Sequence, residues 1–432
     1  HHQDVHAVAR VGGGGDSQGI LSVGSDSSAS NSGTLSVVST GGSALGMGSY
    51  GKYADVDNSG VISVAGYDNA VGIGSAGVYT ANVSNSGTID VAVYGIGAYA
   101  AGISVESANG SITVDNSGDI SVTSTGDGSG PVVTLLPYAE GADGVGVSAI
   151  AYTEASAPTL LYGPTDVNET NSGNIYVNVA GDGTGMYAAA FGSGNVYQAN
   201  SGTVTVYAGG QGYGMASVSD YGYLDIHNDG IVNVVSTGSA VGITSDGTGA
   251  YADTTVTTGA DSSTSAYSYD GIGVGIIALA EGFGSNSTVN NGGYTYAGGI
   301  AAIGVLDATY NGIAAVYNTG TIEAAGLEAA FGVLDTTKYT GGTVYVNNSG
   351  VIDATALGYA TGVFAYVNAA DASATVVNSG TVNAYGYFDY AYGIEGRVYG
   401  DGSTLDISNS GVVTATSHYF DAVGIEGTAG QD

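Results

Sequence analysis

The chain contains no cysteine and no tryptophan, and only four of its 432 residues are basic. The lack of cysteine rules out disulfide bonds, but it leaves the cellular compartment open because a large core needs no such bonds. Four Lys and Arg residues against 38 Asp and Glu residues give a formal net charge of −34. Because the groups that neutralise phosphates are missing, the composition argues against nucleic acid and other polyanions as partners and favours cations.

Long apolar runs are also missing. No stretch approaches the roughly 20 residues of a membrane-spanning helix, and no charged and then apolar targeting segment opens the chain. Apolar residues nevertheless make up 43% of the composition, too many for a disordered acidic chain. We therefore expect a folded, processed polypeptide with no membrane span.

A short turn sequence recurs throughout the chain, as in SNSGTIDV at 84–91. Most of its copies are 27 to 31 residues apart. Apolar residues stand two positions before the turn asparagine and four and six positions after it, a period of two that predicts a strand on each side. The turn asparagines, which we interpret as structural corners, are Asn31, Asn58, Asn85, Asn116, Asn171, Asn200, Asn228, Asn291, Asn318, Asn348, Asn378 and Asn409.

A second motif keeps step with the first: a small residue, any residue, Gly, and then usually Ile, Val or Met. It reads AVGI at 240–243 and ATGV at 360–363, and we assign further copies to GIGA at 95–98 and GIGV at 271–274. Two copies fall between Asn228 and Asn291, which predicts a turn near Gly259 whose asparagine has been lost. One copy falls between Asn116 and Asn171, which predicts a single turn with insertions.

Each unit of about 29 residues with three short strands matches one coil of a parallel β-solenoid. The sequence predicts an all-β fold of about 13 coils, with an N-terminal segment and first partial coil at 1–30 and one repeat domain at 31–432. Inserted loops near 124–143 and 154–167 contain all four prolines. At the corner, Asn and Gly tolerate positive φ, and stacked asparagines can form a hydrogen-bonded ladder. The second motif marks another corner or a narrow lumen.

These Asn-x-Gly-x-Ile corners resemble the right-handed parallel β-helix of bacterial secreted adhesins, of the autotransporter passenger and filamentous haemagglutinin type. The resemblance extends from about Gly19 to Gly427 and implies a secreted or cell-surface location. The same geometry serves polysaccharide lyases and hydrolases, so the fold alone does not give the function.

Candidate sites for chemistry are sparse. Asp55 and Asp57 lie two apart on one strand face, where they are weak candidates for calcium ligands or simply part of a solvated acidic face. His1, His2 and His6 offer nitrogen ligands for a transition metal, although an expression-tag remnant or a plain terminus explains them as well. We expect no catalytic residues, no enzymatic activity and no required cofactor, with calcium as an optional ion.

Tyrosine is abundant, with 33 residues against six phenylalanines. Tyr176 and Tyr345 alternate with apolar core positions, which predicts that their rings point outward. Outward tyrosines suit sugar stacking or lateral association between solenoids. They also fit strands for purely structural reasons.

Taken together, these features predict an extracellular structural or adhesive β-solenoid that self-associates end to end into a surface fibre or biofilm matrix filament. Its expected partners are copies of itself, head to tail and laterally, and cell-surface or matrix polysaccharide. Two alternatives remain open. One is a polysaccharide-active enzyme with a groove at the inserted loops, and the other is a monomeric passenger adhesin that binds glycans.

Overall fold

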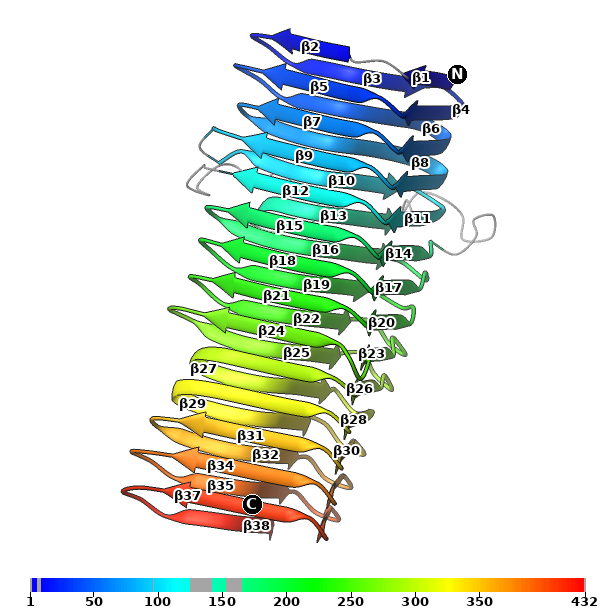
Figure 1. The fold of residues 1–432 in the computed structure, drawn as a ribbon. Coiled ribbons are helices and arrows are strands. Elements are labelled where there is room, and N and C mark those ends of the chain that lie inside the picture. Colours follow the sequence, from blue (N-terminus) through cyan, green and yellow to red (C-terminus); the bar gives the residue numbers. More distant parts are fainter. Residues whose placement is uncertain (1, 6–8, 96, 125–141, 153–164, 431–432) are drawn as a thin grey trace. The chain divides into compact units, whose positions relative to one another are not determined.

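The computed structural model of the protein describes residues 2–5, 9–95, 97–124, 142–152 and 165–430. The chain divides into two compact units, His1–Ser217 and Val218–Asp432. In both, the described residues form strands and turns without a helix, and the strands wind into a parallel β-solenoid with about 13 turns in all. The predicted fold class is confirmed. Figure 1 shows strands of the same kind stacked turn upon turn within each unit.

Three faces make up each turn of the first unit. The first face is built from β1 (His2–Val5), β4 (Asp26–Asn31), β11 (Ser111–Asn116), β14 (Val167–Asn171) and β17 (Val196–Asn200), and all of these strands except β1 end at the corner asparagine. The second face follows the corner and contains β2 (Ala9–Gly13), β5 (Thr34–Ser39), β7 (Val61–Gly66), β9 (Thr88–Val93), β12 (Asp119–Ser124), β15 (Asn174–Val179) and β18 (Thr203–Ala208). The third face carries the second motif and contains β3 (Ser17–Val23), β10 (Tyr99–Ser107), β13 (Ala142–Tyr152), β16 (Asp182–Phe191) and β19 (Gly212–Ser219). Two long strands bend from the third face into the first face of the next turn: β6 (Ala44–Asn58) and β8 (Asn69–Asn85).

The second unit repeats this arrangement. Its first face contains β20 (Leu224–Asn228), β23 (Thr254–Thr258), β26 (Ser287–Asn291), β28 (Ile313–Asn318), β30 (Thr343–Asn348), β33 (Ser373–Asn378) and β36 (Thr404–Asn409). Its second face contains β21 (Ile231–Ser236), β24 (Ser263–Ser268), β31 (Val351–Ala356), β34 (Thr381–Gly386) and β37 (Val412–Ser417). Its third face contains β22 (Ala240–Gly247), β25 (Ile272–Ala280), β32 (Tyr359–Asn368), β35 (Ala391–Tyr399) and β38 (Ala422–Gly430). Here the long strands join the second face to the third: β27 (Tyr294–Thr309) and β29 (Thr321–Thr337).

The lumen of each unit is mainly apolar, as the period of two predicts. Ile62 and Val64 of β7 are buried, and Ile89 and Val91 of β9 stack on them in direct register. In most turns of the second unit, the inward position that holds Val64 and Val91 in the first unit is occupied by alanine. There Ala324 pairs with Ala354 of the next turn. Each turn therefore leaves its inward face unburied until the neighbouring turn covers it.

The corner asparagines form the predicted ladder. In the first unit the side-chain amide of each donates to the amide oxygen of the next, as in Asn31 to Asn58 and Asn58 to Asn85, both at 2.8 Å. In the second unit the same bonds join Asn318 to Asn348 at 2.7 Å and Asn348 to Asn378 at 2.8 Å. Each of these residues is at most 2% exposed. The amides thus satisfy one another inside the protein, where an unpaired polar group is costly.

Both irregular intervals have the predicted explanation. Thr258 takes the place of the lost asparagine, immediately before Gly259, and its hydroxyl donates to the amide oxygen of Asn291 at 2.8 Å. Asn116 and Asn171 are direct neighbours in the ladder at 2.7 Å, so the chain between them is one turn with insertions. The four prolines and most of the predicted insertions, at 125–141 and 153–164, lie outside the described residues.

The structure corrects the predicted role of the corner glycine. None of the described corner glycines has positive φ, so conformational freedom is not the reason for glycine there. A Cβ at Gly60 would instead collide with the carbonyl oxygen of Gly33 in the preceding turn, and a Cβ at Gly87 with that of Gly60. The corner requires glycine because successive backbones approach closely there.

The second motif marks the narrow lumen. A Cβ on Gly332 would meet the Cγ2 methyl of Ile352 across the lumen, and one on Gly362 would meet a methyl of Val382. Two of the predicted motif copies were assigned to the wrong glycine. The strand register aligns Gly102 and Gly275 with the motif glycines of the neighbouring turns, rather than the predicted Gly97 and Gly273.

A substitution in the ladder tests its contribution to stability. We expect Asn348→Ala to lower the free energy of unfolding by about 1–3 kcal/mol, because it removes the acceptor of the Asn318 side-chain N–H and the donor to the Asn378 amide oxygen, both of which are buried. Asn347→Ala is the matched control, since Asn347 points outward from the same strand. Urea unfolding measures both. Equal stability of the two variants would show that the ladder contributes nothing specific.

Candidate functional site

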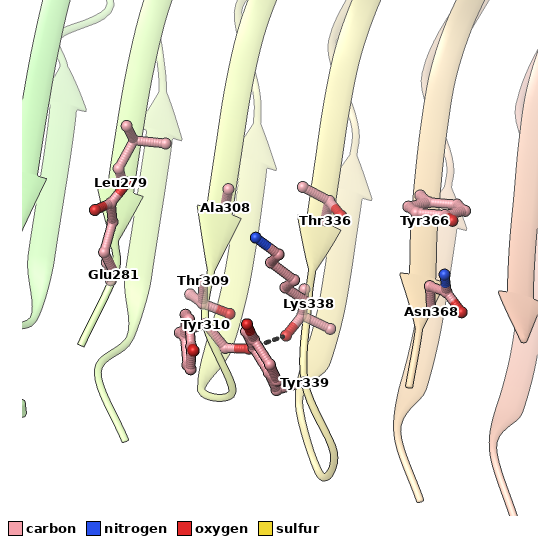
Figure 2. A pocket seen from close by; sticks show the side chains of 12 residues that line it. Leu279, Glu281, Ala308, Thr309, Tyr310, Thr336, Lys338, Tyr339, Tyr366 and Asn368 are labelled. Carbon is pink, nitrogen blue, oxygen red and sulfur yellow. Dashed lines mark hydrogen bonds between the residues drawn. The ribbon is translucent and has the colours of Figure 1, made fainter. Parts of the chain in front are cut away.

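A hollow of about 700 Å³ crosses neighbouring turns of the second unit. Its wall is a row of residues in direct register on four strands: Leu279 of β25, Ala308 of β27, Thr336 of β29 and Tyr366 of β32. Its rim is formed by residues just beyond or at the ends of these strands, among them Glu281, Tyr310, Lys338, Tyr339 and Asn368 (Figure 2). Parallel stacking thus brings residues almost 90 positions apart in the chain to one place.

A pair of tyrosines dominates the rim. The rings of Tyr310 and Tyr339 are stacked with their centroids 3.7 Å apart. A hydrogen bond with the hydroxyl of Tyr339 raises the pKa of Tyr310. The two side chains remain 37% and 40% exposed. They form an amphipathic platform, whose outer ring face can accept a flat apolar surface and whose hydroxyl groups can hydrogen-bond at its edge.

Polar groups surround this platform. Lys338 extends from the end of β29 toward β27 (Figure 2), and its ammonium lies 5.9 Å from the centre of the Tyr339 ring. Lys338 forms no ion pair with any residue that the structure describes. Glu281 and Asn368 lie on opposite sides of the hollow (Figure 2). Aromatic rings with a few fixed polar groups are the usual lining of a small-molecule site.

A pair of carboxyl groups lies beside one edge of the hollow. Asp246 of β22 is the register neighbour of the wall residue Leu279. Burial, together with the charge of Glu281, raises the pKa of Asp246 to about 6. One of its carboxyl oxygens is buried without a hydrogen-bond partner. A half-buried acid next to a second carboxylate is the kind of pair that glycosidases use.

The predicted calcium candidates do lie on one outward face. Asp55 and Asp57 are exposed and alternate with buried Ala54 and Val56. Asp55 accepts a hydrogen bond from the side-chain amide of Asn82 at 2.8 Å. In the described part of the chain, no group of three or more acidic or histidine side chains is arranged to hold a metal ion. Calcium binding stays a prediction.

The predicted histidine cluster is not tested by the structure. His1 and His6 lie outside the described residues, and the side chain of His2 is not described. Metal binding at this terminus therefore stays a prediction as well.

Outward tyrosines form contacts from turn to turn, as expected. Tyr176 is 39% exposed, and its ring centre lies 5.9 Å from that of Tyr207 in the next turn. The partly buried Tyr345 lies 5.6 Å from Tyr317 in the same way.

The sequence pattern predicted these rows of tyrosines but did not predict the hollow. The available signal was position: Tyr310 and Lys338 both stand six residues after the glycine of the second motif, at Gly304 and Gly332.

A separate aromatic patch lies on the turns between β34 and β35 and between β37 and β38. Phe388 and Tyr419 stack at 5.6 Å and are 55% and 61% exposed. Tyr390 packs against Phe420, which is 55% exposed, with ring centres 5.5 Å apart. Exposed aromatic side chains gathered in this way are typical of interaction surfaces.

Acidic side chains also occur inside the lumen. Asp307 and Asp335 are fully buried register neighbours. Burial raises the pKa of both, and the charge of Asp307 raises that of Asp335 further. In the first unit, Glu169 and Gln198 are the two polar exceptions at the apolar position before the corner. They are neighbours, and the Gln198 amide donates to Glu169 at 3.0 Å.

Comparison with protein-family models, with curated proteins and with solved structures gives no match. The described residues include no helix with the length and hydrophobicity needed to cross a membrane.

The buried carboxyl of Glu169 makes stability depend on pH. Burial raises its pKa to about 8, so between about pH 4.5 and 8 the folded state holds a proton that the unfolded state has released. The free energy of unfolding should therefore fall as pH rises through this window, by at most about 1.4 kcal/mol per pH unit from this group.

Urea unfolding at pH 5 and pH 8.5 measures this dependence. We expect Glu169→Gln to reduce it, because the amide is neutral at both pH values and can keep the contact with Gln198. A pH profile that is identical in the variant and the wild type would show that Glu169 keeps the same protonation state on folding.

Proposed function

We propose that the protein is an extracellular structural and adhesive β-solenoid that binds glycan in the hollow around Tyr310 and Tyr339. The observation that carries the proposal is the stacked, exposed tyrosine pair beside Lys338, Glu281 and Asn368. Sugar rings present flat apolar faces edged by hydroxyl groups, which match such a platform and its polar surroundings. The extracellular location rests on the resemblance to secreted adhesins and is part of the proposal.

A solenoid suits an adhesive role for a physical reason. Each turn is held by the turns on either side through parallel backbone pairing and the asparagine ladder, so residues on successive turns keep fixed spacing. A site built across four turns is then ordered before its ligand arrives. Binding loses little conformational entropy when the site is preorganised.

Substitution of the platform tests glycan binding. We expect the wild-type protein to bind at least one oligosaccharide on a glycan array, and Tyr339→Ala to weaken that binding about tenfold, equivalent to about 1.4 kcal/mol. Tyr176→Ala, an outward tyrosine in the first unit, is the control and should bind as the wild type does. An array without any bound glycan would contradict the proposal.

Incubation of the protein with an oligosaccharide that it binds tests a second candidate function. The carboxyl pair of Asp246 and Glu281 beside the hollow favours a polysaccharide hydrolase. Release of new reducing ends from a bound oligosaccharide would establish this activity, and its loss in Asp246→Asn would assign the acid. The inserted loops expected to border such a groove lie mostly outside the described residues.

Self-association is the other part of the proposal. The aromatic patch of Phe388, Tyr390, Tyr419 and Phe420 offers a surface for lateral contact with a second copy. A net charge of −34 opposes association through long-range repulsion, so contact must rely on short-range apolar burial and increase with salt. End-to-end assembly stays a prediction from the sequence.

Sedimentation velocity across a dilution series, at low and at physiological salt, measures this association. We expect the wild type to form larger species as concentration and salt rise, and the double variant Phe388→Ser, Tyr419→Ser to stay monomeric. Tyr53→Ser removes an exposed ring elsewhere and should behave as the wild type. Single particles at every concentration, in sedimentation and in negative-stain micrographs, would rule out self-association.

A further inference from the structure

We infer that the ligand of the hollow is a glycan that carries a single carboxylate, and that Lys338 binds this carboxylate. The inference rests on the proposed glycan binding and specifies its chemistry. Lys338 is exposed on the rim, extends over the hollow and sits next to the ring of Tyr339 (Figure 2).

The rarity of basic residues makes this position informative. The chain has four Lys and Arg residues against 38 acidic ones. Arg397, on the turn that follows the hollow, is neutralised by an ion pair with the fully buried carboxylate of Glu395, which also accepts a hydrogen bond from Tyr359 at 2.7 Å. Lys338 has no such carboxylate among the described residues. Its positive charge is therefore available to a ligand.

The geometry suits a sugar acid. A sugar ring stacked on the Tyr310 and Tyr339 platform would place its substituents within reach of the Lys338 ammonium, 5.9 Å from the ring centre of Tyr339. The ammonium is a compact charge with three donors on a flexible stem, so it can follow a carboxylate without a fixed angle. Hydrogen bonds between charged partners are about twice as strong as neutral ones.

The surroundings limit the ligand to one negative charge. Glu281 lines the same hollow, and Asp246 lies one strand beyond its wall. A second carboxylate on the ligand would approach these acids, and the described residues of the rim include no further free cation. The net charge of −34 adds long-range repulsion against a polyanion. A glycan whose sugars are neutral except for one acidic sugar avoids the repulsion by Glu281 and Asp246 and reduces the long-range repulsion.

Isothermal titration with three probes tests the inference: lactose, 3′-sialyllactose and trigalacturonate. The first two share a disaccharide and differ by one acidic sugar, and the third carries a carboxylate on every sugar. For the wild type we expect 3′-sialyllactose to bind at least tenfold more tightly than lactose, with trigalacturonate weaker than 3′-sialyllactose. A charge-assisted hydrogen bond accounts for a difference of this size.

Substitutions separate the inference from the proposed function. We expect Lys338→Ala to weaken 3′-sialyllactose about tenfold while changing lactose less than twofold, and Lys338→Arg to restore part of the loss. Lys52→Ala is the control, since Lys52 is exposed in the first unit and does not line the hollow.

Equal binding of lactose and 3′-sialyllactose, unaffected by Lys338→Ala, would overturn the inference and leave glycan binding intact. Tightest binding of trigalacturonate would overturn the limit to one charge. Absence of binding by all three probes, with an array that binds no other glycan, would overturn both the inference and the proposed function.

Discussion

The stacking of one turn directly upon the next is the constraint on which the rest of the structure depends. The asparagine ladder fixes this stacking at one corner, because each buried amide forms its short side-chain hydrogen bonds with the amides of the neighbouring turns, as in Asn318, Asn348 and Asn378. A shift of one residue in register would move the apolar side chains of a strand out of the lumen and break the ladder at the same time. Two independent interactions therefore select the same register.

Glycine serves this arrangement through space rather than flexibility. At the corner, Gly60 and Gly87 allow the backbone of one turn to approach the carbonyl of the turn before. In the lumen, Gly332 leaves room for a methyl of Ile352 on the opposite wall. Acidic side chains that enter the core have a raised pKa, as Glu169 does beside Gln198. The outer surface then remains as the place for function.

On that surface, parallel stacking turns single side chains into rows. Leu279, Ala308, Thr336 and Tyr366 form one wall because they share a register position on four strands. The rim differs from turn to turn. Glu281, Tyr310, Lys338 and Asn368 occupy the same position on four successive turns, each six residues after the glycine of the second motif. An acidic scaffold with a tyrosine platform and one unpaired lysine is suited to select its ligand by charge as well as by shape.

The sequence by itself determined the fold class, the corner asparagines and the lost corner near Gly259, because these features repeat along the chain and repetition strengthens a weak local signal. It also determined which tyrosines point outward, since alternation in a strand fixes the side. Only the tertiary structure decided the motif glycines Gly102 and Gly275, because Gly97 and Gly273 stand nearby in similar sequence and strand register alone separates them. It alone assembled the hollow, whose residues are ordinary in the sequence and meet only when turns stack.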